Sequence, residues 1–328
     1  LTDLTENLSG TSSDLAAAFA GTVTAQTGTI TITNNNYTVA ELITINAATT
    51  GAIVLNDPSG ALSGTSSDIA AALAGTITTH TGNVAVTNNN YTLAKLKSIN
   101  DASTGTITLS TRDVALTGSG SDLAAALTAT INYTGNVTVS GSDYTAAQLK
   151  TINDTTSGTI TLSTPGVNLS GTVAQLKAGF AGTVTTHTGT ITISDAATTD
   201  ITATDITTIN TASTGAITVT NAIDINGSGS EVAAAFTAID TNTGNATANV
   251  TGNDYTAAHL KTINDATTGA IVLDNAGVAL SGTSSDLTAA FAGTVTTHTG
   301  TVGITNADYT LAELVTINNA SSGAITLT

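Results

Sequence analysis

The 328-residue chain contains no cysteine, no methionine and no tryptophan. The lack of cysteine excludes disulfide bonds and thiolate metal sites. The lack of methionine means that the chain does not begin at a translation start, so we expect a processed product or a piece of a longer protein. A Lys-poor composition rich in Thr, Gly and Ala is typical of exported bacterial proteins. It predicts an extracellular or cell-surface location.

Charged residues are also scarce, and most of them are acidic. They make up 9% of the chain, with 23 acidic against 6 basic residues and a formal net charge of -17. Binding to phosphates or to anionic lipid needs clustered Lys and Arg, so this balance argues against nucleic acid and against docking on a membrane surface. No apolar run approaches the length of a membrane span.

Two segments alternate along the whole chain. One reads LSGTSSDLAAAFAG and begins at residues 8, 62, 116, 169, 225 and 280. The other reads YTVAELITIN and begins at residues 37, 91, 144, 201, 255 and 309. Self-similarity at a period of about 54 residues indicates a stacked repeat array. We therefore predict one repeat solenoid over residues 1–328, with six repeats that start near the first set of positions.

Each half-repeat carries the signals of a strand followed by a helix. The strand signal alternates apolar and polar residues, as in Ile30-Thr31-Ile32. The helix signal is a capping box, in which a Ser or Thr is followed three residues later by an acidic residue or Gln, as in Thr11 with Asp14 and Thr38 with Glu41. The other pairs begin at residues 65, 119, 145, 172, 202, 228, 283 and 310. Lys95 and His259 interrupt the series and predict two weaker caps.

These signals predict an α/β solenoid of about twelve parallel coils, each with a strand and a short helix. The first inward residues of the expected strands are at positions 30, 53, 84, 107, 137, 160, 191, 217, 246, 271, 302 and 325. The alternative is an all-β parallel helix in which the capping segments are only corners. The capping boxes and the run Ala16-Ala17-Ala18 favour helices.

One asparagine follows the expected helix in every repeat. These residues are Asn46, Asn100, Asn153, Asn210, Asn264 and Asn318. They are candidates for a ligand-binding ladder, but polar groups in a turn must themselves be satisfied. We therefore assign the six asparagines, together with Thr11, Asp14, Thr38 and Glu41, a structural role.

Histidine recurs in one column of the repeat, at His80, His187 and His298. Zinc ligands must all lie about 2 Å from one ion. Residues that are several coils apart cannot meet this condition within one chain. We expect this column to be polar and to face solvent.

Three aspartates, Asp143, Asp254 and Asp308, precede the residue that opens the second segment and are weak calcium candidates. Calcium takes six to eight oxygen ligands, and acidic repeats often supply them. However, the chain has neither the glycine-rich nonapeptide of calcium-binding β-rolls nor an EF-hand loop. Other repeats have Asn in place of Asp at this position, and turn formation explains why the two residues exchange. We therefore expect no cofactor.

No pattern of catalytic residues appears in the chain. It has no nucleophile elbow between a long buried strand and a full helix, no phosphate-binding loop and no dinucleotide fingerprint. We therefore expect a protein that is not an enzyme.

The outward strand positions are mostly threonine. Eight of the twelve are Thr, at residues 31, 108, 138, 161, 192, 218, 247 and 326. Flat Thr ladders are a feature of ice-binding faces. Here Val, Ala and Gly interrupt the ladder, and Thr also favours exposed strand positions in general.

The segments TAAQLKTINDTTSGTITLS, from Thr145, and TAAHLKTINDATTGAIVL, from Thr256, carry a resemblance. They resemble repeats of very large surface or secreted proteins of cyanobacteria and related bacteria, which are labelled repeat-containing or hemolysin-like. The resemblance implies an exported structural or adhesive role and carries over no catalytic residue.

We therefore expect a non-enzymatic extracellular structural protein, a rigid solenoid segment of a surface fibre, sheath, layer or adhesin stalk. Its expected partner is itself, head to tail or in a longer array, because the ends of a solenoid expose strand edges and core. The alternative is a binding module that recognises calcium, a surface glycan or ice along a repeated face.

Overall fold

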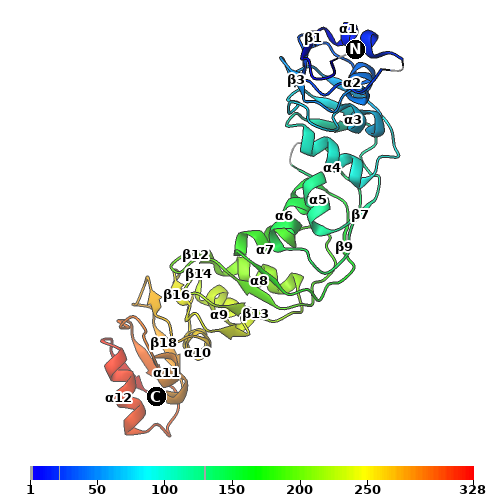
Figure 1. The fold of residues 1–328 in the computed structure, drawn as a ribbon. Helices are drawn as coiled ribbons and strands as arrows, with labels where there is room; N and C mark the ends of the chain where they lie inside the picture. The colour runs from blue at the N-terminus through cyan, green and yellow to red at the C-terminus, as the bar shows by residue number, and fades with distance from the viewer. Residues whose placement is uncertain (1–2, 22, 129–130) are drawn as a thin grey trace. The chain divides into compact units, whose positions relative to one another are not determined.

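The computed structural model describes residues 3–21, 23–128 and 131–328. It divides into two compact units, one of residues 1–164 with 181–185 and one of residues 165–180 with 186–328. Each unit is built from short parallel strands alternating with short helices (Figure 1). The predicted α/β solenoid is thus confirmed, whereas the continuation of the two units as one array stays a prediction.

Twelve helices lie in the described residues, and they fall into two sets. We call coils of the first segment first-half coils and those of the second segment second-half coils. The first-half helices are α1 (Ser12–Phe19), α3 (Ser66–Ala72), α5 (Gly120–Ala126), α7 (Val173–Gly179), α9 (Gly229–Ala238) and α11 (Ser284–Ala290). The second-half helices are α2 (Val39–Ala47), α4 (Leu93–Ala102), α6 (Ala146–Thr155), α8 (Ala203–Ala212), α10 (Ala257–Ala266) and α12 (Leu311–Ala320). Within each unit, consecutive helices pack against one another.

The first unit contains three parallel sheets of three strands each. Their strands are β1 (Leu8–Gly10), β2 (Ile30–Ile32) and β3 (Ile53–Leu55); β4 (Leu62–Gly64), β5 (Val84–Val86) and β6 (Ile107–Leu109); and β7 (Leu116–Gly118), β8 (Val137–Val139) and β9 (Ile160–Leu162). Each sheet pairs three strands that follow one another along the chain. The sheet order therefore repeats the order of the sequence.

The second unit has less regular sheets. The first contains β10 (Leu169–Gly171), β11 (Ile191–Ile193), β13 (Ile217–Val219) and β15 (Thr241–Asn242). The next contains β12 (Asp200–Thr202), β14 (Asp224–Gly227), β16 (Thr247–Val250) and β17 (Ile271–Leu273). The last contains β18 (Leu280–Gly282), β19 (Val302–Ile304) and β20 (Ile325–Leu327) and restores the pattern of the first unit.

Helices and strands follow two different periods. Helices α1, α2 and α3 begin at residues 12, 39 and 66, whereas the paired strand residues are Leu8, Ile30 and Ile53. The helices thus begin 27 residues apart, whereas the paired strand residues are 22 or 23 residues apart. Because the strands recur at a shorter interval than the helices, each successive strand lies at a different position relative to its helix. A new strand, Leu62–Gly64, then starts the next sheet. The sequence reasoning missed this third strand per repeat because it treated Leu-Ser-Gly as part of the helix start.

The core is a narrow column of inward-facing aliphatic residues. Ile30, Ile32, Leu42 and Ile45 have no exposed surface, and equivalent positions recur in both units. One predicted inward position is shifted. Ile271 pairs with Ala248 rather than with Ala246, so the outward partner of Val272 is Asn249 and the predicted Thr247 lies two residues away.

A column of glycines allows successive coils to touch. A Cβ atom added at Gly105 would overlap the carbonyl oxygen of Gly82 in the preceding coil. Gly51 has the same relation to Gly28. Only glycine has room at these positions, where backbone faces backbone.

Candidate functional site

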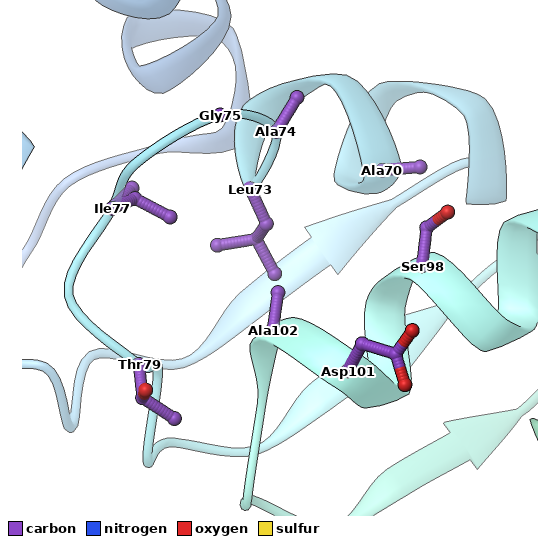
Figure 2. A pocket seen from close by; sticks show the side chains of 9 residues that line it. All are labelled: Ala70, Leu73, Ala74, Gly75, Ile77, Thr79, Ser98, Asp101 and Ala102. Atoms are coloured by element: carbon purple, nitrogen blue, oxygen red, sulfur yellow. The ribbon is translucent and has the colours of Figure 1, made fainter. Parts of the chain in front are cut away.

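One hollow in the first unit lies between the chain leaving α3 and helix α4 (Figure 2). Leu73, Gly75 and Ile77 line one side of it, and Ser98 and Asp101 the other. The Asp101 carboxylate is already paired with Lys97, at 2.8 Å. The hollow therefore has few polar groups that converge on a ligand.

The same hollow occurs one repeat earlier, between α1 and α2. Phe19, Gly21 and Val23 line it there, opposite Thr44 and Ala47. No acidic residue is present in this second hollow, so the two share shape but not chemistry. The hollow is a consequence of placing a short helix and its exit loop beside a longer helix.

Four of the six Ile-Asn asparagines bond to the end of the next helix or to the chain just after it. Asn46 Nδ2 donates to the carbonyl oxygens of Ala71 (2.9 Å) and Ala74 (2.8 Å), at the end of α3. Asn100 donates to Ala125 at the end of α5 (2.7 Å). The other bonds of this kind join Asn153 to Ala181 (2.7 Å) and Asn264 to Ala289 (2.8 Å). The last carbonyls of a helix lack partners within the helix, and these side chains supply them.

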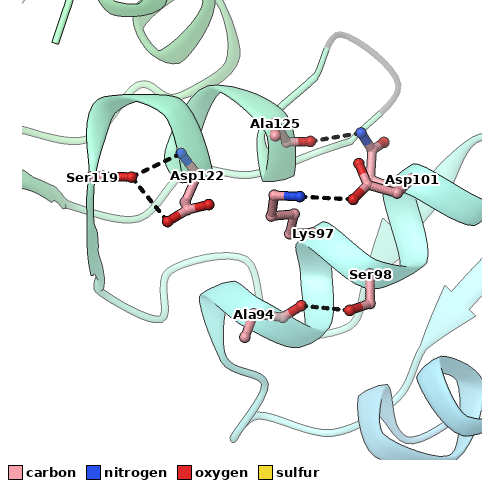
Figure 3. A network of polar contacts seen from close by, with 8 residues as sticks. Ala94, Lys97, Ser98, Asp101, Ser119, Asp122 and Ala125 are labelled. Atoms are coloured by element: carbon pink, nitrogen blue, oxygen red, sulfur yellow. Dashed lines mark hydrogen bonds and ion pairs between the residues drawn. The ribbon is translucent and has the colours of Figure 1, made fainter. Parts of the chain in front are cut away.

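Figure 3 shows the α4–α5 junction, where polar contacts are made at both ends of α5. Lys97 reaches Asp101 on the same helix, and Ser119 bonds both the amide and the carboxylate of Asp122 at the start of α5. The carbonyl of Ala125 accepts a side-chain N–H at the other end of α5. The polar residues of this junction thus bond to one another and to backbone.

A second asparagine column, which the sequence reasoning treated only as a turn, serves the opposite end of the same helices. Asn34 Oδ1 accepts the N–H of Ser12, the first residue of α1, at 2.7 Å. Asn88 does the same for Ser66, and Asn306 for Ser284, each at 2.7 Å. The signal in the sequence was the constant separation of 22 residues between donor and acceptor.

The histidine column is buried, which corrects the expectation that it faces solvent. His80, His187 and His298 have no exposed surface. In each, Nε2 is 2.7 Å from a carbonyl oxygen of the preceding coil, those of Gly60, Val167 and Val278. In each, Nδ1 faces a serine hydroxyl of the next coil at 3.3–3.4 Å, those of Ser103, Ser213 and Ser321.

These contacts place a proton on Nε2 of each histidine, because a carbonyl oxygen only accepts. At His187 the hydroxyl of Ser213 also donates to the His187 carbonyl oxygen, at 3.0 Å. Burial lowers the pKa of all three imidazoles, which opposes a second proton. In other repeats Gln26 and Tyr133 take the same place and donate to the carbonyls of Glu6 and Val114. The column is a set of buried donors between coils.

The helix caps divide by side-chain length. Thr38 with Glu41 forms a complete capping box, because the Glu41 carboxylate also accepts the Thr38 N–H at 2.8 Å. Complete boxes also begin at residues 145, 172, 228 and 310. Thr11 accepts the amide of Asp14 at 3.2 Å, but the shorter Asp14 side chain reaches only the Thr11 hydroxyl. The prediction of a full box was therefore wrong at Thr11, and for the same reason at Thr65, Ser119 and Thr283.

Three further caps deviate from the reciprocal pattern. Lys95 and His259 still donate their backbone N–H groups to the preceding threonines, at 3.4 and 3.2 Å, as half-caps. Thr202 makes no side-chain cap, which is a second correction, and Asp205 instead pairs with Lys177 at 2.5 Å.

The calcium candidates lie in separate repeats. Asp254 Oδ1 accepts the N–H of Gly229 at 3.1 Å, and this bond holds the pKa of the carboxyl below its usual range. Asp308 accepts from Asn306 Nδ2 at 2.6 Å, which also lowers its pKa. Over residues 3–21, 23–128 and 131–328, no three His, Cys, Asp or Glu side chains are grouped to hold a metal ion. These contacts describe turn and helix-start chemistry.

The outward threonines form only short ladders. Thr117, Thr138 and Thr161 pair in register across β7, β8 and β9. Neighbouring sheets place Ser9, Thr31 and Val54, or Ser281, Gly303 and Thr326, at the same positions. A row of hydroxyl residues therefore extends across the three-stranded sheet of β7, β8 and β9. A second row, Ser170, Thr192, Thr218 and Thr241, extends in register across β10, β11, β13 and β15, whereas Val, Ala or Gly interrupts the row in the sheets that begin with β1, β4 and β18.

Fold and site together define the class of the protein: an α/β solenoid whose recurring polar residues join neighbouring coils. Comparison of the chain with protein-family models, with curated proteins and with solved structures finds no match. Among the described helices, none is long and apolar enough to cross a membrane.

Proposed function

We propose that this chain is a non-enzymatic structural protein of the cell exterior, a rigid segment of a fibre, sheath, layer or adhesin stalk. The observation that carries the proposal is the use of its repeated polar residues. Asn34, Asn46 and His80 each bond to the backbone of an adjoining coil. The repetition in the sequence is thus accounted for by bonds between neighbouring coils, as expected of a stacked array in which each repeat contacts only its neighbours.

The composition and the resemblance to large bacterial surface proteins support an exported location. The scarcity of lysine and the net charge of -17 suit a soluble surface that does not self-associate at random. The location is tested with antibodies raised against the purified chain. Immunogold labelling of intact source cells is the expected result, and labelling that appears only after permeabilisation would overturn the proposal.

Recognition of a repeated face is the second candidate function. The in-register ladder of Thr117, Thr138 and Thr161 is the observation that favours it, with ice or a surface glycan as the ligand. Thermal hysteresis of the purified protein, or retention on a glycan array, would support this candidate. A melting temperature that rises with calcium and falls with chelator would indicate the calcium alternative.

A further inference from the structure

The single arginine of the chain lies in an exposed connection between two sheets. Arg112 is the only arginine among six basic residues. It lies between β6, which ends at Leu109, and β7, which begins at Leu116, and both Arg112 and Asp113 are exposed. Trypsin-like serine proteases recognise such a cation, because an aspartate in their specificity pocket binds the side chain of Arg or Lys.

The five lysines lie in helices. They are Lys95 and Lys97 in α4, Lys150 in α6, Lys177 in α7 and Lys261 in α10. A helical segment must unfold locally before a protease can bind and cut it. Four of the lysines also pair with aspartate carboxylates. Arg112 is therefore the one basic residue of the chain that a protease can reach without unfolding a helix.

The connection that holds Arg112 differs from its counterparts. Four connections of six residues join the last strand of one sheet to the first strand of the next. Three of them, residues 56–61, 163–168 and 274–279, read NDPSGA, STPGVN and DNAGVA, and each contains a turn. Residues 110–115 read STRDVA, with neither glycine nor proline and no such turn. This connection therefore lacks the local constraints of the other three.

The carbonyl group of Arg112 is also held by fewer backbone bonds than its counterparts. It accepts one N–H group, that of Thr134, at 2.9 Å. The carbonyls of Pro58, Pro165 and Ala276, at the same place in the other connections, each accept two N–H groups at 2.7–3.3 Å. Proteolysis of a folded chain follows the population of the locally opened state. Opening at Arg112 breaks one such bond instead of two.

Contacts across the connection join the residues before it to those after it. The side chain of Asn100 donates to the Ala125 carbonyl at 2.7 Å, and the Leu109 N–H donates to Asn132 Oδ1 at 2.8 Å. Helices α4 and α5 pack against each other. Because β6 and β7 belong to different sheets, a cut between them interrupts no strand.

We propose that the Arg112–Asp113 bond is a processing site for a trypsin-like serine protease. Hydrolysis breaks the C–N bond between the two residues. The oxygen of water becomes part of a carboxylate on Arg112, and the Asp113 nitrogen takes a proton and becomes an amine. The two products, residues 1–112 and 113–328, stay associated through the contacts between α4 and α5. The proposal goes beyond the structural function, which does not depend on the cut.

The test is limited digestion of the folded 328-residue protein with trypsin, followed by mass spectrometry of the fragments. Wild type should give residues 1–112 and 113–328 before any cut at a lysine. The Arg112→Gln variant should stay intact over the same period, and Arg112→Lys, which keeps the cation, should be cut at the same bond. Intact wild type, a first cut at a lysine, or equal cleavage of Arg112→Gln would each overturn the proposal.

A matched double variant, Arg112→Gln with Ala276→Arg, tests the part played by the connection. It moves the arginine to the equivalent place before β18, where the carbonyl accepts N–H groups from Thr299 and Gly300. Cleavage there should be about fivefold slower than at Arg112 in wild type, because a second backbone hydrogen bond must break. Equal or faster cleavage would show that residues 110–115 are not specially suited to a protease.

Size-exclusion chromatography of the cut protein tests whether the two pieces stay together. In native buffer they should elute as one species at the volume of the uncut chain, and in urea they should separate. Pieces that separate in native buffer would contradict the predicted association. None of these results bears on surface location, which immunogold labelling reports separately.

Discussion

First-half and second-half coils differ in how the ends of their helices are satisfied. Complete capping boxes open the second-half helices α2, α6 and α12, and also the first-half helices α7 and α9. First-half helices also receive bonds from neighbouring coils: for α1, Asn34 of the next coil bonds the first amide, and for α3, Asn46 of the previous coil bonds the last carbonyls.

The difference explains why the repeat contains two coils rather than one. Helices of about two turns are not stable alone. Second-half coils, which carry the asparagines, therefore alternate with first-half coils, whose helix ends those asparagines bond. Of the first-half helices, α3, α5, α7 and α11 have seven residues, while α4, α6, α8, α10 and α12 have ten. The shorter helices are those held from outside.

The largest expected effect compares the glycines that follow the two kinds of helix. Gly105→Ala, after α4, places a methyl group on the Gly82 carbonyl, and we expect a loss of about 3 kcal/mol or more in unfolding free energy. Gly75→Ala, after α3, has room but keeps a φ of +72°, which costs about 1–2 kcal/mol. Urea unfolding followed by circular dichroism measures both. Equal losses would show that backbone contact does not distinguish the two positions.

The next effect tests the bond from a second-half coil to a first-half helix. Asn100→Ala removes the donor to the Ala125 carbonyl and should cost about 1–2 kcal/mol. Asn318→Ala is the matched control, because Asn318 is exposed and no described first-half helix follows it. We expect a change within about 0.5 kcal/mol in the monomer. Thermal unfolding at low protein concentration compares the two, and a large loss in the control would contradict the assignment.

The sequence predicted the helices through signals that lie within one helix turn. Thr38 and Glu41 are three residues apart, so their pairing is readable without any knowledge of the fold. The bond from Asn34 to Ser12 was not readable in this way, because it depends on how one coil is placed on the next. The burial of His80 was missed for the same reason. Its partner, the Gly60 carbonyl, is 20 residues away, and the different periods of helices and strands hide that register.

A pH experiment tests the buried donor column. Folding lowers the pKa of His80, His187 and His298. Below the ordinary histidine pKa of about 6.5, the unfolded chain therefore binds more protons than the folded chain. The stability due to these sites is therefore complete above that pH and is lost as the pH falls below it. Aromatic rings of Tyr37 and Phe180 pack beside His80 and His187 and offer no compensating charge.

Gln26 provides the matched substitution for this column, because it donates to a carbonyl without titrating. A variant with all three histidines changed to Gln should keep the neutral-pH melting temperature within a few degrees, on the order of a 1 kcal/mol change. Between neutral pH and the acid limb of the carboxylates, its melting temperature should fall less than that of wild type. Parallel curves for the two proteins would show that the buried imidazoles do not control acid stability.

The smallest expected effect separates the two kinds of cap. Glu41→Ala removes the acceptor for the Thr38 N–H and for the buried hydroxyl of Ser12, 3.0 Å away, and should cost about 1 kcal/mol. Asp68→Ala removes only a bond to the Thr65 hydroxyl and a favourable charge at the start of α3, so about 0.5 kcal/mol is expected. Chemical unfolding midpoints resolve the difference. If Asp68→Ala lowered the unfolding free energy as much as Glu41→Ala, the extra methylene of Glu would not explain why the cap at Thr38 is a complete box and the cap at Thr65 is not.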